Sequence, residues 1–221
     1  MSQKNKIHTM WPTYFGEFYN PEHEEIKIDL VDYFKRYMND KPSKKNNGEN
    51  YNLYESEYNL HLEGNPAFNR LIKEFIAKGF VAMAKQANKG LLNIENKNLD
   101  VTITASWFIH YEKSGFVLPH SHISNSSWCC VYYLQLGKDA TKINGGTYFQ
   151  KPLPNRHTVD YGSLYNKYTM TQFAPEEGKM LIWPSYLSHG SFPYTGGDDK
   201  IIISANAEIP LLENNKPIAC F

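Results

Sequence analysis

The sequence predicts a mainly β, α+β domain in which helices cover the outside of a sandwich or barrel of short strands. Helical periodicity dominates the N-terminal part of the chain, and alternating strand patterns dominate from residue 101 onward. Helices followed by short strands with long loops are typical of a closed or sandwiched sheet with helices packed against its outside. A chain of 221 residues fits one such domain and would be cramped as two.

Two helices are predicted before the strands. The first follows Asp29, a suitable N-cap, and the second runs from Pro66, after the N-cap Asn65, to Gly90. The apolar residues of the second form one stripe: Phe68, Leu71, Ile72, Phe75, Ile76, Phe80 and Met83. We expect this stripe to pack against the back of a sheet, and the polar stretch 39–50 to be an exposed loop.

Five strands are predicted, at residues 101–111, 128–136, 145–150, 179–183 and 200–209. Alternation in the first strand puts six residues on one face: Val101, Ile103, Ala105, Trp107, Ile109 and Tyr111. In the last strand one face carries Lys200, Ile202, Ser204 and Asn206. The other face carries Ile201, Ile203, Ala205 and Ala207, which suits packing under helices.

Composition excludes several classes of protein. The hydrophobic fraction is 41% and the aromatic fraction 14%, which is ample for a packed core. Lys plus Arg equals Asp plus Glu, 23 each, so charge gives no reason to expect nucleic acid or an anionic membrane as a partner. No apolar run approaches the ~20 residues of a membrane helix, and the N-terminus lacks the layout of a signal peptide. We therefore expect a cytoplasmic protein.

The three cysteines do not form a disulfide framework. Their count is odd, and Cys129 and Cys130 are adjacent, so their side chains point to opposite faces of a strand. We interpret them as small buried hydrophobic residues.

A pair of histidines, His120 and His122 in the sequence PHSH, is the first candidate for metal binding. On an extended backbone, residues two apart point to the same side with Cβ atoms roughly 6–7 Å apart, so two imidazoles can converge on one ion. Iron and zinc need a third ligand at about 2.0–2.1 Å, and His189, just past a strand and a turn, is the best candidate. The same spacing also arises by chance in surface loops.

The other histidines have less specific interpretations. His110 alternates with threonine and phenylalanine near the proposed site and is a candidate to support a ligand or contact the substrate. His157, in a long polar loop, is a candidate for the entrance to the site. We expect His8, His23 and His61 to be solvated, because they lie in polar surroundings.

Residues 107–206 resemble the iron(II)- and 2-oxoglutarate-dependent oxygenases, in particular the small oxygenases found widely in bacteria and phages, which are distantly similar to prolyl 4-hydroxylases. The matching pieces, in order, are Tyr111, Gly115 and His120; VYYL at 131–134, then GGTYF at 145–149; GKMLIWPSYLSH at 178–189; and KIIISAN at 200–206. Residues 50–60 and the helix after them also look like the region that precedes the barrel in this branch.

The resemblance implies a double-stranded β-helix, the jelly-roll or cupin-like core, within a single domain over residues 1–221. Residues 1–100 would be a helical support region, 101–210 the core and 211–221 a tail. It also implies Fe(II) on the three histidines, with 2-oxoglutarate and O2 as co-substrates for the oxidation of a second substrate. Lys200, 11 residues after His189, would bind the distal carboxylate of 2-oxoglutarate, helped by hydroxyls of Tyr111, Tyr133 or Ser204.

Two residues depart from the family pattern. His122 stands where the usual second ligand is Asp or Glu, and three neutral ligands leave the full divalent charge on the metal. That favours anionic co-ligands and also suits zinc. Lys200 stands for the usual Arg, which loses bidentate pairing but keeps the charge. As a lysine at a strand end, it could instead reach water.

Two alternatives therefore stay open. One is a cupin-like three-histidine metalloenzyme that needs no 2-oxo acid, either a dioxygenase or a zinc hydrolase or isomerase. The other is a binding barrel without metal. The sequence identifies neither the substrate nor the oligomeric state. The loop 151–173, with Tyr161, Tyr165 and Tyr168, is either a lid or substrate wall or a packing element.

Overall fold

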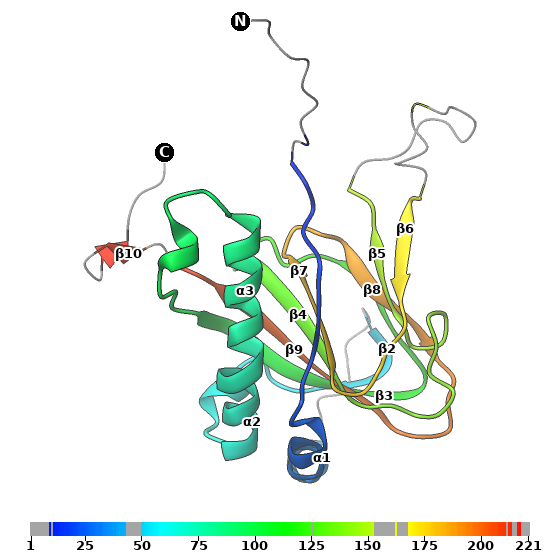
Figure 1. Ribbon diagram of the computed structural model, residues 1–221. Coiled ribbons are helices and arrows are strands. Elements are labelled where there is room, and N and C mark those ends of the chain that lie inside the picture. The colour runs from blue at the N-terminus through cyan, green and yellow to red at the C-terminus, as the bar shows by residue number, and fades with distance from the viewer. Residues whose placement is uncertain are drawn as a thin grey trace, which may run out of the picture.

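A nine-stranded, mostly antiparallel sheet curls into a half-barrel, and three helices lie against its outside (Figure 1). The computed structural model describes residues 9, 11–42, 50–124, 126–152, 162, 168–210, 212–213 and 216–217. The strand order is β1-β7-β4-β9-β3-β8-β5-β6, and β2 also pairs with β3. The predicted jelly-roll architecture with external helices is confirmed.

The strands are β1 (Gly16–Tyr19), β2 (Asn50–Glu55), β3 (Thr102–His120), β4 (Trp128–Gln135), β5 (Thr147–Gln150), β6 (Met170–Phe173), β7 (Lys179–Pro184), β8 (His189–Tyr194), β9 (Lys200–Glu208), β10 (Leu212–Glu213) and β11 (Lys216–Pro217). The helices are α1 (His23–Asp40), α2 (Pro66–Leu71) and α3 (Ala77–Ala87). A π-helical turn, Ile72–Ile76, joins α2 to α3, and short 3-10 turns lie at Leu60–Leu62 and Ile94–Asn96. The part before residue 101 is thus not only helical, because β1 and β2 belong to the sheet.

The long strand β3 connects the two halves of the barrel. Its first part pairs with β9 over Thr102–Tyr111, and its last part pairs with β8, where His120 lies opposite His189. The pairing with β8 begins at Gly115, whose backbone is so close to β2 that a Cβ there would lie 2.4 Å from the Asn52 carbonyl oxygen. Only glycine fits this close approach, which explains a glycine between Tyr111 and His120.

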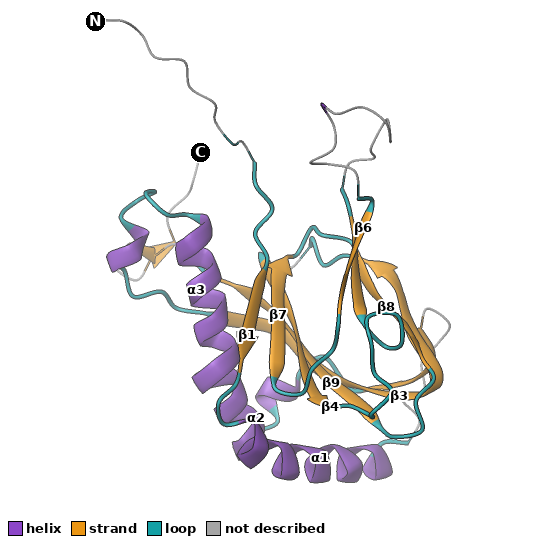
Figure 2. Cartoon of the chain, turned by 45° about the vertical axis from the view of Figure 1, so that its right-hand side comes forward, coloured by secondary structure: helices purple, strands orange, loops and turns teal. Residues whose placement is uncertain are grey.

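Two hydrophobic cores lie on the two faces of the sheet. The outer core joins helix residues to alternate residues of β9, and it includes Ile201, Ile203, Ala205 and Ala207 as predicted. The inner core fills the half-barrel and includes Ile202 and Trp107. In Figure 2, α3 runs alongside β1 and β7. The predicted N-cap of α2 is also present, because the Asn65 side chain accepts a hydrogen bond from the Phe68 N–H at 3.0 Å. The apolar stripe therefore packs against the sheet as expected.

Strict alternation in the first predicted strand was wrong at its start. Ile103 pairs with Ala207 and Ala105 pairs with Asn206, so Thr104 is an extra residue that forms a β-bulge. Val101 and Ile103 consequently pack against the outer core, whereas Thr104 and Ala105 both turn to the inside of the barrel. A bulge moves residues between faces, and alternation alone does not reveal it.

His23 and His61 are not solvated, contrary to expectation, and His8 lies outside the described residues. His23, the first residue of α1, is 6% exposed. Its Nδ1 lies 2.6 Å from the Tyr132 hydroxyl on β4, and its Nε2 lies 3.8 Å from a Glu177 carboxylate oxygen. Burial lowers the pKa of His23, against the opposing effect of the Glu24 and Glu177 carboxylates. His61 is half-buried, and its Nδ1 lies 2.9 Å from the Ser106 hydroxyl.

We predict that His23 makes the stability of the metal-free protein depend on pH. Its folded pKa lies below the usual 6.5, so the unfolded chain takes up a proton first as the pH falls, and stability is lost below about pH 6.5. In His23→Gln this titration is absent, and the free energy of unfolding should fall less between about pH 7 and pH 5. Urea unfolding of both proteins across this range measures the difference. Identical slopes would contradict the prediction.

Candidate metal centre

Three histidines that are distant in the sequence converge at one edge of the half-barrel. His120 ends β3, His122 follows two residues later, and His189 begins β8. Their ring centroids are separated by 4.8 Å for His120–His122, 4.3 Å for His120–His189 and 5.2 Å for His122–His189. One nitrogen from each ring lies within 4.8 Å of the other two. The predicted residues are therefore close enough to share an ion.

Backbone contacts orient two of these rings. Nδ1 of His120 donates to the Leu118 carbonyl, and Nδ1 of His189 donates to the Leu187 carbonyl, each at 2.9 Å. Because a carbonyl only accepts, the proton must be on Nδ1, and Nε2 keeps its lone pair for a metal. His122 is held through its backbone N–H, which donates to the Ser185 carbonyl at 2.9 Å.

The surroundings favour the neutral form of two of these imidazoles, His122 and His189. Burial, helped by the nearby His120, lowers the pKa of His122 to about 4. Burial also lowers the pKa of His189 well below its usual value. Trp107 packs 5.8 Å from the His122 ring and Trp183 packs 4.6 Å from the His189 ring, measured between centroids. Three imidazole nitrogens held close together are a donor set suited to iron or zinc.

A cavity of about 790 Å³ opens beside the histidines, inside the half-barrel. Its polar or titratable lining residues are Glu55, Tyr58, Thr104, Trp107, Tyr111, His120, Ser121, His122, Thr147, Ser191, Ser204 and Asn206. Tyr111 and Thr104 both line the cavity, and they are seven residues apart on β3. The cavity lining therefore extends along this strand. The cavity is therefore long enough for more than one ligand group.

Lys200 is buried one layer behind this wall. The residue is 1% exposed, its Nζ donates to the Gly145 carbonyl at 2.7 Å, and the same atom lies 3.4 Å from the centre of the Tyr111 ring. The described part of the chain contains no carboxylate within ion-pair distance of it, and burial lowers the pKa of Lys200 well below its usual value. The alternative that this lysine reaches water is wrong.

Two pairs of hydroxyl groups lie in this part of the barrel, and Tyr111 of one pair contacts Lys200 through its ring. The Tyr111 hydroxyl donates to Ser191 Oγ at 3.1 Å, and the Tyr133 hydroxyl lies 2.7 Å from Thr147 Oγ1. Tyr111 lines the cavity itself, whereas Tyr133 reaches it through Thr147. Ser191 was missed, although it follows His189 by two residues and so shares its face of β8.

Ser204 lines the same cavity but at another level. It is four residues from Lys200 on β9, which corresponds to about 13 Å along the strand. Ser204 pairs with Trp107, which packs on His122, so it belongs to the metal end of the cavity rather than to the lysine end.

Other candidates lie away from the centre. His110 is on the outer side of β3, where its Nε2 lies 3.1 Å from an Asp199 carboxylate oxygen, so it neither supports a ligand nor lines the cavity. His157, Tyr161 and Tyr165 lie outside the described residues, as does Cys220. Cys129 and Cys130 are buried, as predicted.

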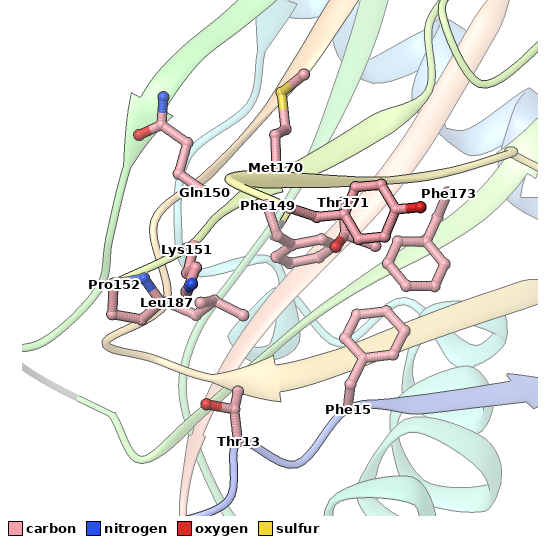
Figure 3. Close-up of a pocket in the computed structure, with 11 residues that line it drawn as sticks. Thr13, Phe15, Phe149, Gln150, Lys151, Pro152, Met170, Thr171, Phe173 and Leu187 are labelled. Carbon is pink, nitrogen blue, oxygen red and sulfur yellow. The ribbon is translucent and has the colours of Figure 1, made fainter. Parts of the chain in front are cut away.

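A second cavity, of about 250 Å³, is lined by residues of β5 and β6 and by Phe15, which precedes β1 (Figure 3). Phe15, Phe149, Phe173 and Leu187 form much of its apolar wall, and the exposed Tyr168 lies at its edge. None of the three histidines lines it. His120 and His122 line the larger cavity instead.

The inner strands and the histidines match a known family. Residues 105–206 match the model of a family described as "Putative 2OG-Fe(II) oxygenase". This segment of the chain is therefore similar to the 2OG-Fe(II) oxygenase family. The match begins just after the bulge residue Thr104 and includes all three histidines and Lys200. Together with the jelly-roll fold it indicates a 2-oxoglutarate/Fe(II)-dependent oxygenase, with Fe(II) as cofactor and 2-oxoglutarate as co-substrate.

Solved structures share the fold of this oxygenase at low sequence identity. HygX from Streptomyces hygroscopicus, with nickel and 2-oxoglutarate bound, is 10% identical with a TM-score of 0.53, over 88% of this chain and 82% of HygX. The viral collagen prolyl hydroxylase vCPH from Paramecium Bursaria Chlorella virus-1 is 12% identical with a TM-score of 0.53, over 88% and 95%. A Pseudomonas putida prolyl-4-hydroxylase is 11% identical with a TM-score of 0.53, over 87% and 91%.

No curated protein matches the chain in sequence. Among the described residues, no helix has the length and apolar character needed to cross a membrane.

Proposed function

We propose that this oxygenase couples the oxidative decarboxylation of 2-oxoglutarate to the hydroxylation, or a related oxidation, of a second substrate. His120, His122 and His189 would hold Fe(II), and Lys200 would anchor the co-substrate. The observation that carries the proposal is that three imidazoles converge beside one cavity, and that a buried lysine without a carboxylate partner contacts Tyr111 in the wall of the same cavity. The nickel and 2-oxoglutarate bound in the structure of HygX support it.

The three histidines would bind the metal on one face only. When bound, Fe(II) would supply the redox chemistry that uses O2 to oxidise both the 2-oxo acid and the second substrate. Ligands on one face leave positions open for a bidentate 2-oxo acid and for O2. Because all three ligands are neutral, the full divalent charge stays available to attract the carboxylate next to the 2-oxo group.

The second carboxylate of 2-oxoglutarate would be bound at the lysine end. A buried ammonium group without an anion is costly, and a carboxylate that enters the cavity offsets this cost. Tyr111, Thr147 and Ser191 carry hydroxyls on the wall in front of Lys200 and could donate hydrogen bonds to the same carboxylate. Lys200 would supply the charge and the hydroxyls the directed contacts.

One observation favours a second candidate. His122 replaces the carboxylate ligand that is usual in this family, and a three-histidine centre also suits a cupin-like enzyme that needs no 2-oxo acid. The buried Lys200 has no role in that alternative. The two candidates therefore differ in whether 2-oxoglutarate binds near Lys200.

We predict that His189→Ala abolishes stoichiometric Fe(II) binding while the protein stays folded, because it removes one of three nitrogen ligands. Metal content after anaerobic loading, with circular dichroism to confirm folding, measures this. His110→Ala is the matched control, because His110 lies outside the cavity and should not alter iron content. Full occupancy in His189→Ala would remove the ligand assignment.

We predict that Lys200→Met weakens 2-oxoglutarate binding by about two to three orders of magnitude. An unpaired carboxylate in this cavity costs roughly 3–5 kcal/mol, and each ~1.4 kcal/mol is tenfold in affinity. Calorimetric titration of 2-oxoglutarate into the manganese-substituted protein measures the loss. Lys179→Met is the control, since Lys179 is equally buried but paired with Glu176 at 2.7 Å. Equal affinities in wild type and Lys200→Met would show that the lysine does not anchor the co-substrate.

The proposed reaction itself has a direct test. Iron-loaded protein should slowly release succinate from 2-oxoglutarate in air, even without its second substrate, because the metal and the co-substrate suffice for the decarboxylation half. His189→Ala should release none above the rate of free iron. If the wild type neither binds 2-oxoglutarate nor releases succinate, the cupin-like alternative becomes the better one.

A further inference from the structure

Three buried polar atoms without a hydrogen-bond partner belong to residues that line the same part of the large cavity. They are Thr104 Oγ1, Trp107 Nε1 and Asn206 Oδ1. The described residues hold six buried side-chain atoms of this kind in total, so half of them come from one wall. Buried polar atoms without a partner are rare in folded proteins, because each loses its hydrogen bonds to water on folding.

The β-bulge in β3 brings these residues together. Asn206 on β9 lies opposite Ala105, and Trp107 lies opposite Ser204 one step further into the barrel. Without the bulge, alternation would place Thr104 on the outer face, away from both. Bulges are frequent beside active sites, where they redirect a side chain. The regular pairing of β3 with β9 is therefore interrupted at Thr104, whose hydroxyl turns toward this wall.

This wall is distinct from the lysine end of the cavity. Asn206 is six residues from Lys200 on β9, about 20 Å along the strand. At the other side it adjoins the metal centre, because the Trp107 ring packs 5.8 Å from the ring of His122. With 2-oxoglutarate between Lys200 and the metal, the part of the cavity at Thr104 and Asn206 would still be open.

We propose that Thr104, Trp107 and Asn206 recognise an uncharged group of the second substrate that both accepts and donates a hydrogen bond, a hydroxyl or an amide. This inference rests on the proposed function, since it assumes that the metal centre is where that substrate reacts.

The chemistry of the three groups defines the ligand. The Trp107 indole N–H only donates, the Asn206 carbonyl oxygen only accepts, and the Thr104 hydroxyl does either. A hydroxyl or an amide meets both requirements at once. Lys and Arg are absent from the cavity lining, so an anionic group would find no matching charge at this wall. The one carboxylate of the lining, Glu55, lies opposite Ile109 on β3, away from Thr104 and Asn206.

Stability provides the first test, and it needs no metal. Thr104→Val replaces a hydroxyl without a partner by a methyl group of similar shape, so the melting temperature of the metal-free protein should rise by about 2 °C or more. Ser106→Ala is the matched control on the same strand, because the buried Ser106 hydroxyl accepts from the His61 backbone N–H at 2.9 Å, and its loss should lower the melting temperature. No rise, or a fall, in Thr104→Val would show that this hydroxyl already has a partner and would overturn the inference.

Binding of small probes provides the second test. Acetamide stands for an amide and ethanol for a hydroxyl, and Mn(II) in the metal centre, with 2-oxoglutarate present, would speed the relaxation of their methyl protons when they bind nearby. In the double variant Thr104→Val, Asn206→Leu this enhancement should fall about fivefold or more for at least one probe. The probe that loses more identifies the group. Equal enhancement in wild type and variant would overturn the inference.

The proposed function and the recognition site can be tested separately. Mn(II) and 2-oxoglutarate binding are titrated first in both proteins, and loss of either in the wild type would remove the proposed function. Intact Mn(II) and 2-oxoglutarate binding with unchanged probe relaxation would remove only the recognition site at Thr104, Trp107 and Asn206.

Discussion

The candidate site depends on the way one strand, β3, pairs with two others. Its first part pairs with β9 and its last part with β8, and the change occurs near Gly115, where only a residue without a side chain fits against β2. Through the first pairing Tyr111 comes to lie over Lys200. Through the second, His120 comes to lie opposite His189. A shift in either register would separate the groups that the proposed reaction needs together.

The charges around the cavity are consistent with an anionic co-substrate. Burial keeps the imidazoles of His122 and His189 neutral, so no positive charge opposes a metal ion there. At the other end, Lys200 is held by a carbonyl and an aromatic ring, which are weaker partners for an ammonium group than a carboxylate. A metal ion and a lysine at the two ends of a polar wall suit a molecule with a carboxylate at each end.

Local patterns were enough to predict much of this arrangement. Alternation in β9 identified both of its faces, and the spacing of His120 and His122 identified two of three histidines that the fold brings together. His189 was chosen because it lies just past a strand and a turn, whereas the role of Lys200 came from the family resemblance. Residues that depend on contacts between distant segments were missed. Thr104 changed face through a bulge, and Thr147 approaches Tyr133 only once β5 folds over the barrel.

The pairing of β3 with both β9 and β8 has a further consequence for the molecules that the cavity can select. His120 and Tyr111, whose ring contacts Lys200, are parts of one continuous strand, so the backbone of β3 fixes how far apart these two residues lie. In the proposed binding mode, this fixed separation would select the co-substrate by its length. A dicarboxylic 2-oxo acid one carbon shorter would leave one of its carboxylates short of its contact, and one carbon longer would have to buckle. The geometry of the sheet would then determine which length of 2-oxo acid binds.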